Sequence, residues 1–166
     1  LMVRSQTKVN RNIIEAGKNL KIIGRAGVGV DNIDVNSATE KGIIVVNSPD
    51  GNTIAASEHT IALMLAISRN IVPASQSTKE GKWNRDAFTG TELFGKTLGV
   101  MGFGRIGRKV VNIALSIGMK VIVYDPFANE ETVNKACALY ETSLDNFLKT
   151  LDYLSIHIPK TSDTIN

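Results

Sequence analysis

The chain has 166 residues, of which 43% are hydrophobic and 21% are charged, and its formal net charge is +3. This composition is typical of a globular protein with one core, or with one domain and part of another, and it excludes a disordered chain. No apolar run approaches the roughly 20 residues of a membrane span and no secretory leader pattern is evident, so we expect a cytoplasmic protein without a membrane partner.

Cysteine and histidine are too sparse for a cross-link or a metal site. Cys137 is the only cysteine, and His59 and His157 lie far apart in the sequence. We therefore expect no disulfide and no bound metal. Few aromatic residues and no nucleic-acid motif argue against a nucleic-acid partner. The first 30 residues carry six basic residues against Glu15 alone, which fits either an anionic ligand or a solvated basic face.

The first part of the chain alternates short apolar runs with helical stretches. Residues 1–5, 20–24 and 43–47 are predicted strands. A helix is predicted over 10–19, ending near Gly17, and a second helix, capped by Asp34 or Asn36, runs through Thr39 to Lys41 and is closed by Gly42. This β-α-β-α-β order predicts a parallel sheet.

The middle of the chain breaks this rhythm. Proline and glycine interrupt it at 48–52, and a helix apolar on nearly every side follows over 53–70. Such a helix is expected to be buried, between domains or between subunits. Residues 72–94 lack a clear period and are predicted to form an irregular arm or linker.

A second β-α-β rhythm begins near residue 97. Its first strand leads into Gly102, Gly104 and Gly107, which have the G-x-G-x-x-G spacing of a dinucleotide loop, with Arg105 and Ile106 inside it. The first glycine allows a tight turn, the second a close approach of backbone to pyrophosphate, and the third close packing of helix on sheet. The predicted elements are strands at 97–101, 120–125, 138–141 and 152–158, and helices at 105–117, ended by Gly118, and at 143–150, capped by Ser143.

Asp125 follows Gly107 by 18 residues, at the end of the next predicted strand. A carboxylate there accepts hydrogen bonds from an adenosine ribose and repels a 2′-phosphate, so NAD is predicted over NADP. The alternative is a structural strand-turn-helix with a capping aspartate. The fold class is α/β, with a truncated doubly wound parallel sheet of the Rossmann type. Because a whole dinucleotide needs a larger sheet, we expect a piece of a longer protein.

A second glycine-rich stretch, "GRAGVGVDN" at 24–32, lacks the dinucleotide spacing. Seven further stretches are informative beside it: "VRSQTKV" (3–9), "GIIVVNSPDGNT" (42–53), "EHTIALMLAISRNI" (58–71), "GKWNRDAFTGTEL" (81–93), "GKTLGVMGFGRIGR" (95–108), "GMKVIVYDP" (118–126) and "HIPKTSDT" (157–164). With these stretches the chain resembles the D-isomer-specific 2-hydroxyacid dehydrogenases over essentially its whole length. The resemblance implies that residues 1–47 belong to a flavodoxin-like substrate domain. It further implies that 48–94 form a bridging helix and a dimerisation arm, and that 95–166 begin the NAD domain.

The resemblance also implies binding residues. The loop at 24–32 is expected to bind a substrate carboxylate through the amides of Val28 and Gly29, with Arg25 holding the anion. Alternatively, Gly27 and Gly29 only shape a turn and Arg25 forms a structural ion pair. The residues expected to bind substrate are Arg4, Arg25, Val28, Gly29, Asn52 and, from a neighbouring subunit's arm, Arg85; those expected to contact NAD are Gly102, Gly104, Arg105, Ile106, Gly107, Asp125, Ile158 and Val28.

In this family a hydride passes from C2 of a hydroxy acid to nicotinamide, assisted by an arginine, a glutamate and a histidine that follow the segment resembling residues 157–164. We therefore expect no catalytic residue in this chain, and a structural role for His59 and His157. The expected activity is NAD-dependent oxidation of 3-phospho-D-glycerate to 3-phosphohydroxypyruvate, the first step of phosphorylated L-serine biosynthesis. A glyoxylate or hydroxypyruvate reductase and a non-enzymatic, NAD-sensing corepressor-like protein are the alternatives. Self-association as a dimer or tetramer is expected through 53–94.

Overall fold

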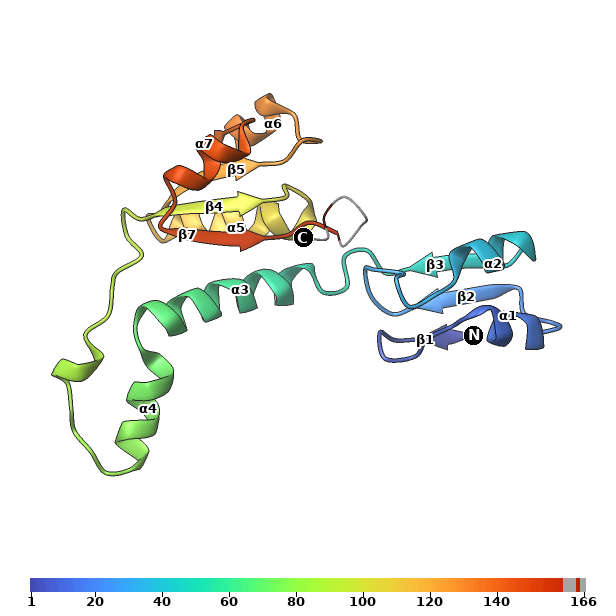
Figure 1. Cartoon of the computed structure of the whole chain (residues 1–166), viewed down its shortest axis with the longest axis horizontal. Helices are drawn as coiled ribbons and strands as arrows, with labels where there is room; N and C mark the ends of the chain where they lie inside the picture. Colours follow the sequence, from blue (N-terminus) through green and yellow to red (C-terminus); the bar gives the residue numbers. More distant parts are fainter. Residues whose placement is uncertain (160–163, 165–166) are drawn as a thin grey trace. The chain divides into compact units, whose positions relative to one another are not determined.

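The computed structural model describes residues 1–159 and 164. It divides into two compact units, Leu1–Thr53 and Ile54–Asn166. Each unit has its own parallel sheet (Figure 1). Among the described residues, no helix has the length and apolar character needed to cross a bilayer.

The first unit is a three-stranded parallel sheet with two short helices. Its strands are β1 (Met2–Val3), β2 (Ile22–Arg25) and β3 (Ile44–Asn47), in the spatial order β1-β2-β3. The helices α1 (Arg11–Ala16) and α2 (Val35–Glu40) connect them. The predicted β-α-β-α-β order and the parallel sheet are confirmed, with shorter elements than the sequence suggested. The core consists of Val3, Val9, Ile14, Ile23, Ile33, Ala38 and Ile43.

Side-chain caps fix where these helices begin. The Asn10 side chain accepts a hydrogen bond from the Ile13 amide, and the Asp34 side chain accepts one from the Ser37 amide. Each cap satisfies an N–H group that has no partner inside the helix. Asp34, rather than Asn36, is therefore the cap of α2.

The second unit contains a four-stranded parallel sheet in the order β6-β5-β4-β7. The chain moves outward from the central strand β4 to β5 and β6, and then returns to the other side of β4 with β7. The order therefore reverses beside β4. The strands are β4 (Thr97–Met101), β5 (Lys120–Tyr124), β6 (Leu139–Tyr140) and β7 (Tyr153–Ile156), and the helices between them are α5 (Arg105–Ser116), α6 (Glu130–Lys135) and α7 (Leu144–Lys149).

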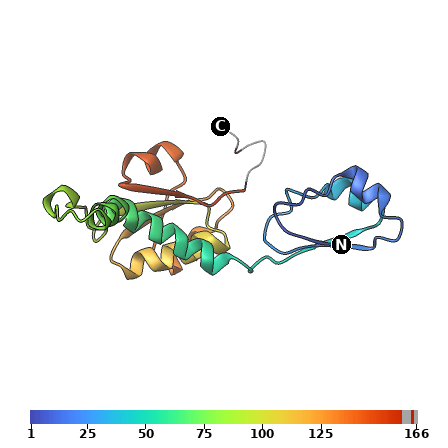
Figure 2. The ribbon, with the colours of Figure 1, turned by 90° about the horizontal axis from the view of Figure 1, so that it is seen from below.

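Helices cover both faces of this sheet, with α5 and α7 on opposite sides (Figure 2). On one face, Leu98 and Val100 pack in one core cluster with Val110 and Val111 of α5. On the other face, a Cβ at Gly99 would lie 2.8 Å from the Phe147 ring of α7, which is fully buried. Glycine at 99 therefore allows α7 to approach the central strand closely.

The helix expected over 53–70 ends two residues early, and within this chain only part of its surface is buried. In α3 (Thr53–Ser68), Ser57, Ile61, Met64 and Ser68 form a buried stripe. Ile67 is 75% exposed and Leu63 is 51% exposed, and other apolar side chains of α3 are exposed to a smaller or similar extent. Within this chain one stripe of α3 meets the core of the second unit, and burial of its other apolar side chains between domains or between subunits stays a prediction.

The arm at 72–94 is more regular than predicted. It contains a helix, α4 (Ile71–Lys79), and a 3-10 turn, η1 (Asp86–Phe88). Pro73 lies in the first turn of α4, where a backbone N–H has no intrahelical partner and proline is tolerated. The segment was predicted to be irregular because it lacks a clear apolar period. Helix α6 was not predicted, although Asn129 caps it and two glutamates occupy its first turn.

Candidate functional site

The glycine loop joins β4 to α5, as predicted. Gly102 has a φ of +95°, and a Cβ there would lie 2.7 Å from the carbonyl oxygen of His157. A Cβ at Gly107 would collide with the carbonyl oxygen of Gly102. Both positions therefore require glycine for the fold itself.

Gly104 differs from its two neighbours. It is exposed and caps α5 with extended backbone, and a Cβ there would meet nothing within 4 Å. The space over the loop is consequently open, next to the first-turn N–H groups of a 12-residue helix. Open space beside helix N–H groups fits an anionic group such as a pyrophosphate.

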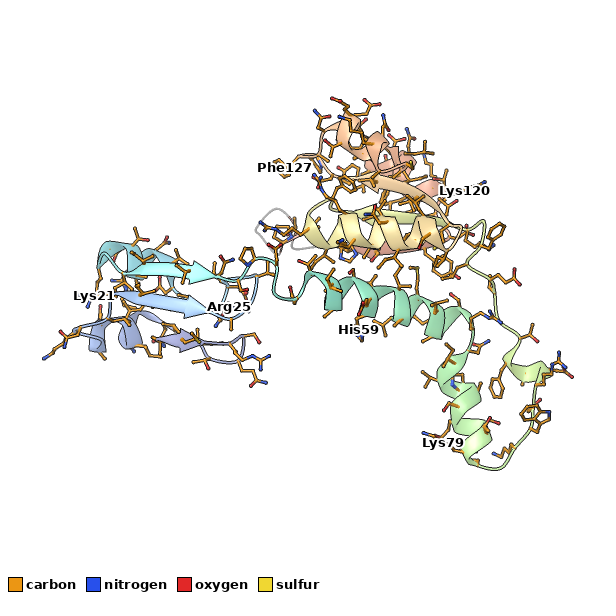
Figure 3. The ribbon with its side chains drawn as sticks, turned by 180° about the vertical axis from the view of Figure 1, so that it is seen from behind. Lys21, Arg25, His59, Lys79, Lys120 and Phe127 are labelled. Atoms are coloured by element: carbon orange, nitrogen blue, oxygen red, sulfur yellow. The ribbon has the colours of Figure 1, made fainter. Side chains whose placement is uncertain are left out.

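Asp125, directly after β5, reaches the glycine loop. One carboxylate oxygen accepts a hydrogen bond from the Phe103 amide at 2.7 Å, and the other accepts one from the Phe127 amide at 2.8 Å. The Tyr140 hydroxyl donates to the Asp125 carbonyl at 2.9 Å. Because a carboxylate accepts about four hydrogen bonds, Asp125 holds the loop and retains acceptor sites for a ligand. Phe127 projects from the turn beyond it and is 98% exposed (Figure 3).

Phe103 is held on a second side by α5. Its ring is buried, and the Arg108 guanidinium carbon lies 4.7 Å from the ring centre. The Arg108 Nε donates to the Phe103 carbonyl at 3.0 Å. The loop between Gly102 and Gly104 is therefore fixed through the amide, the carbonyl and the ring of one residue.

The end of β7 borders the same loop. A Cβ at Gly102 would lie 3.0 Å from Ile158, so Ile158 is next to the first loop glycine. His157 is half-buried, and its Nε2 is 2.8 Å from the Ser155 hydroxyl. Burial lowers the pKa of His157 below its ordinary value of 6.5.

The remaining residues predicted to contact the cofactor, and His59, lie at different places in the fold. Arg105 is exposed at the first position of α5. Ile106 packs its side chain against the core, so only its backbone is available to a ligand. Val28 lies in the other unit. His59 is exposed on α3 (Figure 3).

A basic pocket of about 490 Å³ lies in the first unit. It brings together Arg4, Arg25 and Asn52, three of the residues predicted to bind substrate. Arg25 ends β2, and only 10% of its side-chain surface is exposed. No carboxylate lines the pocket among the described residues. Ser5, Ala26, Gly27, Ser48 and Gly51 complete the lining and were not predicted.

The loop at 24–32 is tied to the end of β3 by its carbonyl groups. The Gly27 carbonyl accepts from the Ser48 amide at 3.0 Å, and the Val28 carbonyl accepts from the Asn47 side chain at 2.7 Å. Within residues 1–159, the amides of Val28 and Gly29 have no hydrogen-bond acceptor. Those two amides are thus available to an anion, although neither residue lines the pocket.

Arg85 is not part of the Arg4 pocket. It lines a separate hollow of about 370 Å³ between α4 and η1, together with Trp83 and Phe88. Trp83 is 87% exposed.

Comparison with known proteins gives consistent results. The model of the family described as D-isomer specific 2-hydroxyacid dehydrogenase, NAD binding domain, matches residues 61–166. D-3-phosphoglycerate dehydrogenase of Synechocystis is 54% identical over 167 residues, covering 100% of this chain and 30% of that protein. Hydroxypyruvate reductase of Thermotoga maritima is 51% identical over 164 residues, covering 99% of this chain and 52% of that protein.

Solved structures agree with this assignment. D-lactate dehydrogenase from Aquifex aeolicus, solved with NAD and lactic acid, aligns with a TM-score of 0.88 and 34% identity, covering 98% of this chain and 49% of that one. The chain therefore spans between about a third and about half of the length of these relatives.

Parallel sheets, a glycine loop with open space above Gly104 and an acidic residue after the next strand define an α/β protein of the dinucleotide-binding class. The chain belongs to the D-isomer specific 2-hydroxyacid dehydrogenase family, and residues 61–166 are part of the NAD-binding domain of that family. The expected family is thus confirmed, and with it an NAD cofactor.

Proposed function

We propose that the protein of which this chain is part oxidises 3-phospho-D-glycerate to 3-phosphohydroxypyruvate with NAD, the first step of phosphorylated L-serine biosynthesis. The observation that carries this proposal is the basic pocket, in which Arg4 and Arg25 meet Asn52 and which no carboxylate of the described part of the chain lines. A substrate with both a carboxylate and a phosphate matches two guanidinium groups, which bind such anions in a bidentate manner. The 54% identity to a D-3-phosphoglycerate dehydrogenase supports the same substrate.

The second unit is proposed to be the first half of a doubly wound Rossmann sheet. Its strand order reverses beside β4, and dinucleotides bind where the order of such a sheet reverses. The first unit is proposed to be part of a flavodoxin-like substrate domain. The three regions proposed along the chain are 1–47, 48–94 and 95–166.

The residues present fit NAD. Gly104 leaves room for the pyrophosphate, the N-terminus of α5 favours its charge, and Asp125 has acceptor sites for the ribose. Bound NAD supplies the hydride acceptor. The proposed part of this chain is to hold the cofactor and the substrate anion, while the arginine, glutamate and histidine that assist hydride transfer are proposed to lie in another part of the protein.

A second candidate function is a hydroxypyruvate reductase. The 51% identity to the Thermotoga maritima enzyme favours it, because that value is close to the identity with the D-3-phosphoglycerate dehydrogenase. Hydroxypyruvate lacks the phosphate, so the two functions differ in how much the basic pocket contributes to substrate binding.

Steady-state kinetics of the full-length protein distinguish these functions. We expect kcat/KM for 3-phospho-D-glycerate to exceed that for unphosphorylated D-glycerate by about 100-fold, equivalent to about 2.7 kcal/mol. The reverse direction is measured with 3-phosphohydroxypyruvate and hydroxypyruvate. Turnover of hydroxypyruvate without turnover of either phosphorylated acid would overturn the proposed substrate.

We also propose that the protein self-associates through 53–94. Exposed apolar side chains on α3 and α4, among them Ile67 and Val72, support an interface there. The corepressor-like alternative is tested by the same kinetic assay, because it predicts NAD binding without turnover. The cytoplasmic location stays a prediction.

A further inference from the structure

The side chain of Asn32 uses all of its polar groups at the edge of the basic pocket. Its Oδ1 accepts a hydrogen bond from the Arg25 Nε at 2.9 Å. Its Nδ2 donates to the Arg4 carbonyl at 3.0 Å and to the Thr7 carbonyl at 2.6 Å. An amide side chain has one acceptor oxygen and two N–H donors, so Asn32 engages both kinds of group at once.

These three hydrogen bonds connect the two segments that supply the arginines. Arg4 follows β1, and Arg25 ends β2, which is its neighbour in the sheet. Asn32 holds the backbone at Arg4 and the side chain of Arg25 from a single position. Asn32 therefore adds a side-chain link between these two segments to the backbone pairing of β1 with β2.

The bond to Nε also orients the Arg25 guanidinium. The group is planar, so fixing Nε sets the directions of both terminal nitrogens. A carboxylate also lies near Arg25, since its Nη2 is 3.9 Å from the Asp31 side chain. The Asp31 carboxylate is 85% exposed, and 3.9 Å is much longer than the 2.9 Å hydrogen bond to Asn32, so this ion pair is the weaker of the two contacts. Asn32 is therefore the main constraint on Arg25.

We propose that Asn32 is a positioning residue, which presents Arg4 and Arg25 together to the anionic part of the substrate. The inference rests on the proposed function, because it takes the basic pocket as the substrate site. An aspartate at position 32 would still accept the hydrogen bond from Arg25. Its second carboxylate oxygen, however, would face the carbonyl oxygens of Arg4 and Thr7 and could not donate to them. Asparagine is thus the residue type that satisfies all three partners.

The test uses the full-length protein with Asn32→Ala, Asn32→Asp and Arg25→Lys, and with Asn12→Ala, an exposed asparagine on α1, as the matched control. Inorganic phosphate is the binding probe, titrated by calorimetry, alongside KM and kcat for 3-phospho-D-glycerate. Both Asn32 variants are expected to weaken phosphate binding and raise KM by about 10-fold to 100-fold, with kcat changed less than about 3-fold. The Kd for NAD should not change.

A double-mutant cycle separates positioning from a merely structural role. Lysine has no Nε–H aimed at Asn32, so Asn32→Ala should weaken phosphate binding less in the Arg25→Lys background than in the wild type, and the remaining effect should come from the bond to the Arg4 carbonyl. Additive effects, or equal weakening of NAD and phosphate binding with a lower thermal midpoint, would overturn the proposal. Unchanged phosphate affinity in both Asn32 variants would overturn it as well.

The cycle also distinguishes this proposal from the proposed function. If the wild-type protein binds phosphate but turns over only hydroxypyruvate, the proposed substrate is wrong. The double-mutant cycle, measured with phosphate as the probe, still tests the role of Asn32. A wild-type protein that binds neither phosphate nor the phosphorylated acid would contradict both proposals.

Discussion

At the scale of single residues, the three loop glycines have different physical reasons to be glycine. Gly102 needs a positive φ, Gly107 needs the absence of a side chain against the Gly102 carbonyl, and Gly104 has open space around it. The G-x-G-x-x-G spacing predicted this division. It could not reveal that Asp125 also binds the loop through the Phe103 amide, because that contact joins two strands.

The glycines give a prediction in which stability and cofactor affinity change separately. Gly107→Ala should destabilise the fold by about 1–3 kcal/mol, because the new methyl group overlaps a backbone oxygen. Gly104→Ala should cost less than about 1 kcal/mol, as a poorer helix cap, and should raise the Kd for NAD by at least about 10-fold. Urea unfolding and calorimetric NAD titration of the full-length variants provide the two measurements. Normal NAD affinity in Gly104→Ala would mean that the pyrophosphate does not bind there.

Asp125 is predicted to contribute to affinity and to cofactor choice. Asp125→Ala should weaken NAD binding by about 10-fold, since both the ribose acceptor and the anchor of the loop are lost. It should weaken NADP binding less, because the carboxylate that repels a 2′-phosphate is gone. Titration with both cofactors tests this, with Glu92→Ala, an exposed acidic residue, as the control. An equal loss for both cofactors would leave only the loop-anchoring role.

At the scale of elements, periodicity and caps predicted the helices and strands that carry a strong local signal. Asn10, Asp34 and Ser143 accept hydrogen bonds from the first turns of their helices, as the sequence indicated for Asp34 and Ser143. Helix α4 was missed because residues 72–94 lack a clear apolar period. For α3 the sequence predicted burial, but an all-apolar sequence cannot reveal which side faces the core of the same chain.

The exposed side of α3 leads to a prediction about assembly. Leu63→Glu combined with Ile67→Glu places two charges on apolar surface that is exposed in the single chain. If 53–94 is the interface, the dimer dissociation constant should rise by at least about 100-fold. Light scattering after size-exclusion chromatography of the full-length protein measures the mass, with Asn12→Glu as a control. A monomeric wild-type protein, or an unchanged mass in the double variant, would rule out this interface.

At the scale of the whole molecule, the candidate sites fall in different units. The basic pocket is lined by residues between Arg4 and Asn52, within Leu1–Thr53. The glycine loop and Asp125 belong to Ile54–Asn166. Substrate and cofactor affinity should therefore respond to substitutions in different parts of the chain.

Arg4→Ala is predicted to affect the substrate alone. Removing one guanidinium from the pocket should raise KM for 3-phospho-D-glycerate by about 10-fold to 100-fold and leave the Kd for NAD unchanged. Lys8→Ala removes an exposed cation of the same unit that does not line the pocket, so it controls for net charge. If both variants raised KM equally, a diffuse basic face rather than a pocket would attract the substrate.

The sequence by itself determined the parallel α/β fold, the glycine loop and the acidic residue after the next strand, because these depend on local spacing and hydrophobic period. The family followed from the resemblance of several long stretches to known proteins. Only the tertiary structure decided which residues meet. It brought Arg4, Arg25 and Asn52 into one pocket, left Arg85 outside it, and placed the amide of Asn32 between the two arginines. These contacts join residues on different strands and loops, and no local pattern encodes the distance between them.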